Sequence, residues 1–138
     1  MSVIATFAMV LALTQSPGTA ATPEATVRRS YDAFNTRDAD AFVRHMSEEI
    51  RWMSITGESV KVETSGREPL RAYLARYFQR LPTVQSRIES LMAAGPYVTV
   101  HERVTWQSTT GERTQSALAV YQVTEGRIVA VWYYDVMK

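Results

Sequence analysis

The stretch that decides the fold is Tyr97-Val98-Thr99-Val100-His101-Glu102-Arg103-Val104-Thr105-Trp106, one long strand whose two faces differ in chemistry. Successive side chains of a strand point to opposite faces of a sheet. One face carries Val98, Val100, Glu102, Val104 and Trp106, and the other carries Thr99, His101, Arg103 and Thr105. The polar row is either the wall of a site or the solvated face of an ordinary surface strand.

Three more strands belong to the same predicted sheet. Alternating segments cover residues 84–93, 97–107, 113–124 and 127–136. The segments between them are rich in glycine, proline, serine and threonine, which suits tight turns between antiparallel strands. The four strands are therefore expected to form an antiparallel meander.

Three helices are predicted before this meander. The first begins at Pro23, because proline is favoured in the first turn of a helix. The second follows Asp38 as its N-cap and continues towards Ile50, and the third lies between Gly66 and Pro82. Each has apolar residues three and four positions apart, so each has one face to bury.

Two short strands, 50–56 and 60–63, are expected between the second and third helices. Helices first and long antiparallel strands last make an α+β plan, in which the sheet curls around the helices to bury one face. With 138 residues, 46% of them hydrophobic, and no internal repeat, the chain is long enough for one core.

Composition excludes several classes of partner and cofactor. The 15 basic and 14 acidic residues leave a net charge of +1 without a long run of either sign, so no nucleic-acid partner is expected. The chain has no cysteine and two histidines, His45 and His101, without a clustered ligand motif. We therefore predict neither a metal site nor a cofactor.

The N-terminal segment has the pattern of a signal peptide. Residues 3–13 are almost purely apolar, too short for a bilayer span, and are followed by small residues suited to cleavage. We expect residues 1–22 to be a signal peptide and residues 23–138 the domain, which would be periplasmic or secreted, without a membrane anchor once the signal is removed. The alternative is an N-terminal element that packs on the domain of a cytoplasmic protein.

Several segments together resemble a known family. They are Tyr31-Asp-Ala-Phe-Asn-Thr-Arg-Asp-Ala-Asp-Ala-Phe42, Glu48-Glu-Ile-Arg-Trp52, His101-Glu-Arg-Val-Thr-Trp106, Ala119-Val-Tyr-Gln-Val123 and Gly126-Arg-Ile-Val129. In order and spacing the chain after Pro23 resembles the SnoaL-like group of the nuclear transport factor 2-like superfamily. The resemblance implies a cystatin-like roll: a cone-shaped, strongly curved antiparallel sheet wrapped on the three N-terminal helices, with a ligand pocket inside.

The resemblance also implies which strand faces look inward. The inward set is Trp52, Ser54, Thr99, His101, Arg103, Thr105, Ala117, Ala119, Tyr121, Val131, Tyr133 and Asp135. The outward set is then Val98, Val100, Val104, Trp106, Leu118, Val120, Ala130, Trp132 and Tyr134. So apolar an outer face predicts a homodimer through the sheet. Glu102 would lie on that outer face and need a basic partner there.

Four residues of the inward set are the candidate catalytic groups. His101 or Asp135 would move a proton, and Tyr133 or Arg103 would polarise the substrate. The ligand-contacting candidates are Trp52, Ser54, Thr105, Ala119, Tyr121 and Val131. The alternatives are a structural ion pair between Arg103 and Asp135, and a neutral core histidine at position 101.

Characterised relatives carry catalytic groups that this chain lacks. Ser54, Ser30 and Ala119 stand where ketosteroid isomerases have their base, oxyanion tyrosine and oxyanion aspartic acid. Arg103 matches the arginine of limonene-epoxide hydrolases, but Thr105 and Tyr133 replace the two flanking aspartates. Neither mechanism is encoded in its usual form.

Three functions remain open. The first is an isomerase, cyclase, dehydratase or hydrolase that acts by general acid–base chemistry on a small, partly apolar substrate. The second is a binding protein that uses the same pocket without turnover. The third is a protein-interaction module, the role of nuclear transport factor itself.

Overall fold

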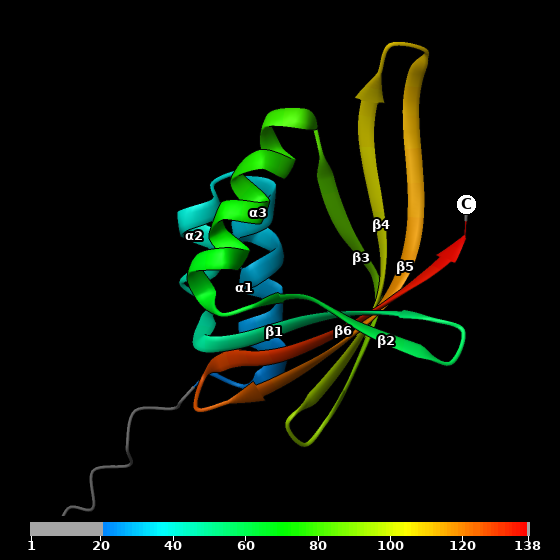
Figure 1. Cartoon of the computed structure of the whole chain (residues 1–138). Helices are drawn as coiled ribbons and strands as arrows, with labels where there is room; N and C mark the ends of the chain where they lie inside the picture. The colour runs from blue at the N-terminus through cyan, green and yellow to red at the C-terminus, as the bar shows by residue number, and fades with distance from the viewer. Residues whose placement is uncertain (1–20, 138) are drawn as a thin grey trace, which may run out of the picture.

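A computed structural model of the chain describes residues 21–137, with side chains up to Tyr134. Three helices lie on one side of a bent six-stranded sheet (Figure 1). The elements in chain order are α1 (Pro23–Asn35), α2 (Ala39–Val43), β1 (Met46–Thr56), β2 (Ser59–Ser65), α3 (Arg67–Arg80), β3 (Gln85–Ala94), β4 (Tyr97–Ser108), β5 (Gly111–Thr124) and β6 (Arg127–Met137). The α+β class and the meander of the last four strands are confirmed.

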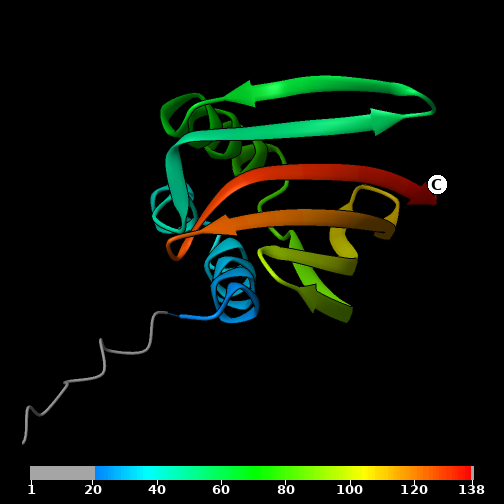
Figure 2. The ribbon, with the colours of Figure 1, turned by 90° about the horizontal axis from the view of Figure 1, so that it is seen from below.

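The sheet has the strand order β2-β1-β6-β5-β4-β3. All neighbouring strands are antiparallel except β1 and β6, which run parallel, so the sheet is mostly and not wholly antiparallel. Figure 2 shows the strands arching over the helices. The expected cone is confirmed, and its concave face is the one that the helices cover.

The second helix is shorter than expected. Asp38 caps it, accepting a 3.1 Å hydrogen bond from the Ala41 amide. The helix ends at Val43, and β1 begins at Met46 instead of Ile50. Met46 is fully buried and pairs with Ile128 of β6, so Met46 and Ile50, which were expected to continue the helix, belong to a strand.

The hydrophobic core lies between the helices and the concave face of the sheet. Leu70, Leu74 and Phe78 enter it from α3, and Val27 and Tyr31 enter it from α1. Burying such side chains is the main stabilising term of a domain of this size. The core also fixes which face of each strand looks inward.

The predicted orientation of β4 is wrong by one residue. Val98 and Val100 are fully buried and Glu102 is only 5% exposed, whereas the Arg103 side chain is 46% exposed. A shift of one residue moves every side chain of a strand to the other face of the sheet. The valine row packs against the helices, because this is where the most apolar surface is removed from water. His101, Thr99 and Thr105, which alternate with that row, therefore lie on the outer, convex face.

No helix within residues 21–137 is long and apolar enough to cross a membrane. The predicted signal peptide lies outside the described residues, apart from its last two positions.

Candidate functional site

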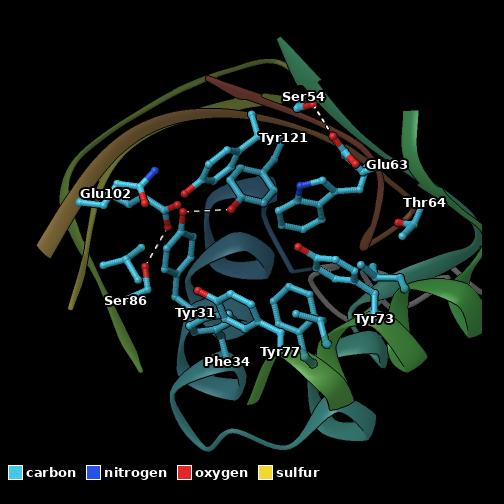
Figure 3. A pocket seen from close by; sticks show the side chains of 17 residues that line it. Tyr31, Phe34, Ser54, Glu63, Thr64, Tyr73, Tyr77, Ser86, Glu102 and Tyr121 are labelled. Atoms are coloured by element: carbon cyan, nitrogen blue, oxygen red, sulfur yellow. Dashed lines mark hydrogen bonds between the residues drawn. The ribbon is translucent and has the colours of Figure 1, made fainter. Parts of the chain in front are cut away.

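A cavity of about 340 Å³ lies between the helices and the concave face of the sheet, within the size range of small-molecule sites (Figure 3). Nearly half of its lining residues are aromatic. The aromatic lining residues are Tyr31, Phe34, Phe42, Trp52, Tyr73, Tyr77, Tyr121 and Tyr133. The more exposed lining residues are Tyr73, which is 43% exposed, and Glu63, whose side chain is 36% exposed. The cavity therefore opens between α3 and β2.

Glu102 is the buried acidic group of this cavity. It projects from the middle of β4 and accepts a 2.8 Å hydrogen bond from the hydroxyl of Ser86 on the neighbouring strand β3. Both side chains are buried, at 5% and 6% exposure. A carboxylate removed from water is costly unless hydrogen bonds or a positive charge compensate it. A buried carboxyl group in a cleft is therefore a candidate for acid–base chemistry.

Asn35 holds the Ser86 segment in place. Its side-chain amide donates to the Ser86 carbonyl at 2.8 Å, and its side-chain oxygen accepts from the Ser86 amide at 2.7 Å. Asn35 is the last residue of α1, so these two bonds tie the end of that helix to β3. Tyr31, one helical turn earlier, faces the same cavity.

Tyrosine hydroxyls surround Glu102. Tyr121 donates a 2.9 Å hydrogen bond to the hydroxyl of Tyr31, which is itself hydrogen-bonded to Glu102. Burial raises the pKa of Tyr31, Tyr121 and Tyr133 well above the ordinary value, and the charge of Glu102 raises each further. These hydroxyls therefore stay protonated at neutral pH, so each keeps one proton that it can donate in a hydrogen bond.

Aromatic rings complete the wall on the α3 side. Tyr73 and Tyr77 stack with their ring centroids 6.4 Å apart at 17°. Burial, with the nearby hydroxyl of Tyr73 and the charge of Glu102, raises the pKa of Tyr77 to about 12. From the sheet, Trp52 and Tyr133 face each other at 6.1 Å. A flat, apolar part of a ligand would fit between these rings.

A second polar group lies across the cavity from Glu102 (Figure 3). Ser54 donates a 2.7 Å hydrogen bond to Glu63, which also lies 3.3 Å from the ammonium group of Lys61. The pKa of Glu63 is lowered mainly by the hydrogen bond from Ser54, and Lys61 lowers it further. Nearby, the Thr64 hydroxyl is buried without a hydrogen-bond partner among the described residues.

The structure brings four of the predicted site residues to this cavity. Trp52, Ser54, Tyr121 and Tyr133 all line it. Ala119 and Val131 lie on the same face of the sheet but are packed in the core and do not line the cavity.

Three predicted site residues lie on the opposite face. His101, Arg103 and Thr105 follow the convex side of β4, and Arg103 donates a 3.0 Å hydrogen bond to Glu89. Their placement in the pocket is therefore wrong. Asp135 pairs with Ala117 in the backbone register, but its side chain lies outside the described part of the chain.

Glu102 and Ser86 are the site residues that the sequence reasoning missed. Glu102 had been placed on the outer face with a basic partner, and it has instead an inward position and a serine partner. Its signal was present, because it is the one charged residue in the buried valine row of β4. Ser86 carries no such signal, because it is one polar residue among several at the start of β3.

The chemistry available in the cavity is proton transfer and hydrogen bonding. Among residues 21–134 the lining holds two carboxyl groups, Glu63 and Glu102, and no lysine, arginine or histidine. Within residues 21–134 no three His, Cys, Asp or Glu side chains come together as metal ligands would. Glu102 can accept a proton, and Tyr133 can donate a hydrogen bond to an oxygen that becomes negative.

Comparisons with known proteins agree with this architecture. The model of the SnoaL-like domain matches residues 27–131. An uncharacterised cystatin-fold protein from Novosphingobium aromaticivorans superposes with a TM-score of 0.70 at 23% identity, covering 81% of this chain and 97% of its own. A comparison with curated protein sequences finds no match.

Two further structures show the same fold at lower identity. One is an epoxide hydrolase of M. tuberculosis described as LEH-like, with a TM-score of 0.66 at 18% identity, covering 79% of this chain and 78% of its own. The other is a hypothetical Catenulispora acidiphila protein solved in complex with trimethylamine. It has a TM-score of 0.68 at 14% identity and covers 79% of this chain and 83% of its own. With three quarters of its length matched by the domain model, this chain belongs to the SnoaL-like domain family.

Proposed function

We propose that this protein binds a small, partly apolar organic molecule in the aromatic cavity and exchanges a proton with it through Glu102. The observation that carries the proposal is the carboxyl group of Glu102, 5% exposed and held by Ser86 inside a cavity walled by aromatic rings. The rings would bind the apolar part of the molecule, and the carboxyl group would act on its polar part.

Glu102 takes the role first assigned to His101 or Asp135. It would accept a proton from the substrate and return it to another atom of the same molecule or to water. Tyr133 would donate a hydrogen bond to the substrate oxygen on which negative charge develops. Isomerisation, cyclisation and dehydration all consist of such steps. Two structures of similar fold are described as a putative ketosteroid isomerase from Kribbella flavida and a putative polyketide cyclase from Bacillus cereus, and they support this class of reaction without naming the substrate.

The alternative is a binding protein without turnover. It is favoured by the absence of the usual carboxylates of characterised relatives at positions 54, 105 and 133. The Catenulispora neighbour, which carries a bound trimethylamine, is consistent with either reading. An interaction module for another protein is less well supported, because it would leave a buried carboxyl group and a cavity of about 340 Å³ without a role.

Proton transfer can be tested before the substrate is known. Purified protein is analysed by native mass spectrometry for a retained small molecule, and the released molecule is then incubated with fresh protein in deuterium oxide. We expect wild-type protein to exchange a carbon-bound hydrogen for deuterium and Glu102→Gln to lose this exchange.

Glu89→Gln is the matched control, because Glu89 is a carboxylate on the outer face, bonded to Arg87 and Arg103. A molecule retained by all three proteins without exchange would point to the binding protein. Protein that retains no molecule, from several growth conditions, would contradict the proposed function as a whole.

We also propose that two copies pair through the convex face of the sheet. Leu118 and Tyr134 are 38% and 39% exposed there, and Trp132 and Val120 lie beside them in the backbone register. Of the five other residues first assigned to the outer face, four belong instead to the core side of β4: Val98, Val100, Val104 and Trp106.

A further inference from the structure

The charge of the cavity lining is unbalanced. In the part of the lining that the structure describes, two ionisable carboxyl groups, Glu63 and Glu102, are matched by no lysine, arginine or histidine. Among residues 21–134, Glu102 forms no ion pair, and the Lys61 partner of Glu63 is 75% exposed and does not line the cavity. An anionic ligand would therefore meet like charge on both sides, and a positive group would compensate a carboxylate removed from water.

The aromatic rings of the lining also favour a positively charged ligand. The faces of tyrosine and tryptophan rings carry partial negative charge and attract cations that lie over them. Trp52 and Tyr133 face each other at 6.1 Å from the sheet, and Tyr73 and Tyr77 stack at 6.4 Å from α3. Several rings around one positive group form the kind of cage that recognises quaternary and protonated amines.

The two carboxyl groups differ in depth. Glu63 is 36% exposed beside the opening between α3 and β2, whereas Glu102 is 5% exposed at the inner end. Figure 3 shows them on opposite sides of the ring of aromatic side chains. A cation would thus be attracted by Glu63 at the entrance and held by Glu102 inside, after passing between the rings.

We propose that the ligand of this cavity is a small organic cation, a protonated or quaternary amine, whose charged group lies between Glu102 and the aromatic wall. This inference rests on the proposed function, since it names the chemical class of the molecule that the same cavity binds. A neutral molecule could also donate a hydrogen bond to Glu102, so the test compares a cation with a neutral molecule of equal shape.

Choline and 3,3-dimethylbutan-1-ol are suitable probes, because they differ only in the replacement of the charged nitrogen by carbon. Isothermal titration of the wild-type protein should show choline binding at least about tenfold more tightly than the alcohol. Trp52 lines the cavity, so its fluorescence should change when either probe enters.

Three variants locate the effect. Glu102→Gln keeps the size of the side chain and one acceptor oxygen for Ser86 and removes the charge, so the preference for choline should fall about tenfold. Glu63→Gln should reduce it less, because this side chain is partly in water. Glu89→Gln, which removes a carboxylate of the outer face, should leave it unchanged.

Equal affinity for the two probes in wild-type protein would overturn the inference and leave the small-molecule function standing. An undiminished preference in Glu102→Gln would also overturn it. If that variant does not fold, the comparison of the two probes on wild-type protein still decides. Binding of neither probe at millimolar concentration overturns the inference as well, and the search for a retained molecule then decides the proposed function separately.

Discussion

The hydroxyl of Ser86 donates a 2.8 Å hydrogen bond to the carboxylate of Glu102 across neighbouring strands β3 and β4. This bond joins the one buried acidic side chain of the described core to a strand that Asn35 fixes to the end of α1. The position of the acidic group is therefore set by contacts on two elements, as a group that acts on a bound molecule requires.

Substitution of Ser86 by alanine should lower the free energy of unfolding by about 1.5–3 kcal/mol, the range for a buried hydrogen bond to a charged group. Urea denaturation measures the loss, and Ser90→Ala, at an exposed position of the same strand, is the control. In the double variant with Glu102→Gln the loss should be smaller, because the charged acceptor is already gone. Equal losses in both backgrounds would show that Ser86 acts independently of Glu102.

Buried tyrosines should make the fold sensitive to alkaline pH. The pKa values of Tyr31, Tyr121 and Tyr133 are raised, chiefly by burial, and that of Tyr77 is raised to about 12. Above pH 10 the unfolded chain releases these protons while the folded chain keeps them, so stability falls as pH rises. Each such tyrosine contributes a slope of about 1.4 kcal/mol per pH unit.

Urea denaturation at several values between pH 9 and pH 11.5 tests this dependence. Tyr133→Phe should reduce the slope, whereas Tyr97→Phe, at a ring that is 45% exposed, should leave it unchanged. Stability that is flat up to pH 11.5 would show that these hydroxyls are not shielded from water.

The turns and the strand order of the meander could be predicted because their signals are local. Gly95 and Gly126 adopt positive φ values of 56° and 74°, which glycine accepts more readily than other residues, and both sit where the turns were expected. The α+β plan follows from the order of the elements and needs no knowledge of long-range contacts.

The site was harder to predict, because its side chains look like core residues in the sequence. Tyr31 and Tyr77 lie on apolar helical stripes, and a stripe that packs on a sheet cannot be distinguished from one that lines a cavity. The orientation of β4 could be predicted from the sequence alone, because the buried row is the more apolar one. The register implied by the resemblance placed the other row inward. The single charge of Glu102 in a valine row was the remaining sign of a site.

Arg103→Gln tests the corrected orientation of β4. The Arg103 side chain is 46% exposed and its partner Glu89 lies on the same outer face. The variant should therefore be as stable as the wild-type protein within measurement error. Ligand retention should also be unchanged, in contrast to Glu102→Gln. Thermal denaturation together with native mass spectrometry makes both comparisons. A strongly destabilised Arg103→Gln would mean that the guanidinium group is buried, as the resemblance had implied.

The convex face of the sheet should join two copies of the chain. Two rows of paired residues cross it, and both are mainly apolar: Met92–Thr99–Val120–Trp132–Met53–Val62 and Ser90–His101–Leu118–Tyr134–Ile55–Val60. No described helix covers these rows, since all three pack on the concave face. An apolar face of this extent is more common in an interface than on the surface of a monomer.

Sedimentation should therefore show a dimer at protein concentrations of about 10–50 µM. In this range even a weakly associated dimer is populated. Leu118→Glu and Trp132→Glu should each shift the protein towards monomer, because a carboxylate removed from water in the interface would have no partner. Gln85→Glu places the same charge on the convex face beside Thr105, outside the two rows, and should remain dimeric. Circular dichroism must show that each variant is folded. A monomeric wild-type protein at 50 µM, or a dimer unaffected by either row substitution, would assign the apolar rows to another contact.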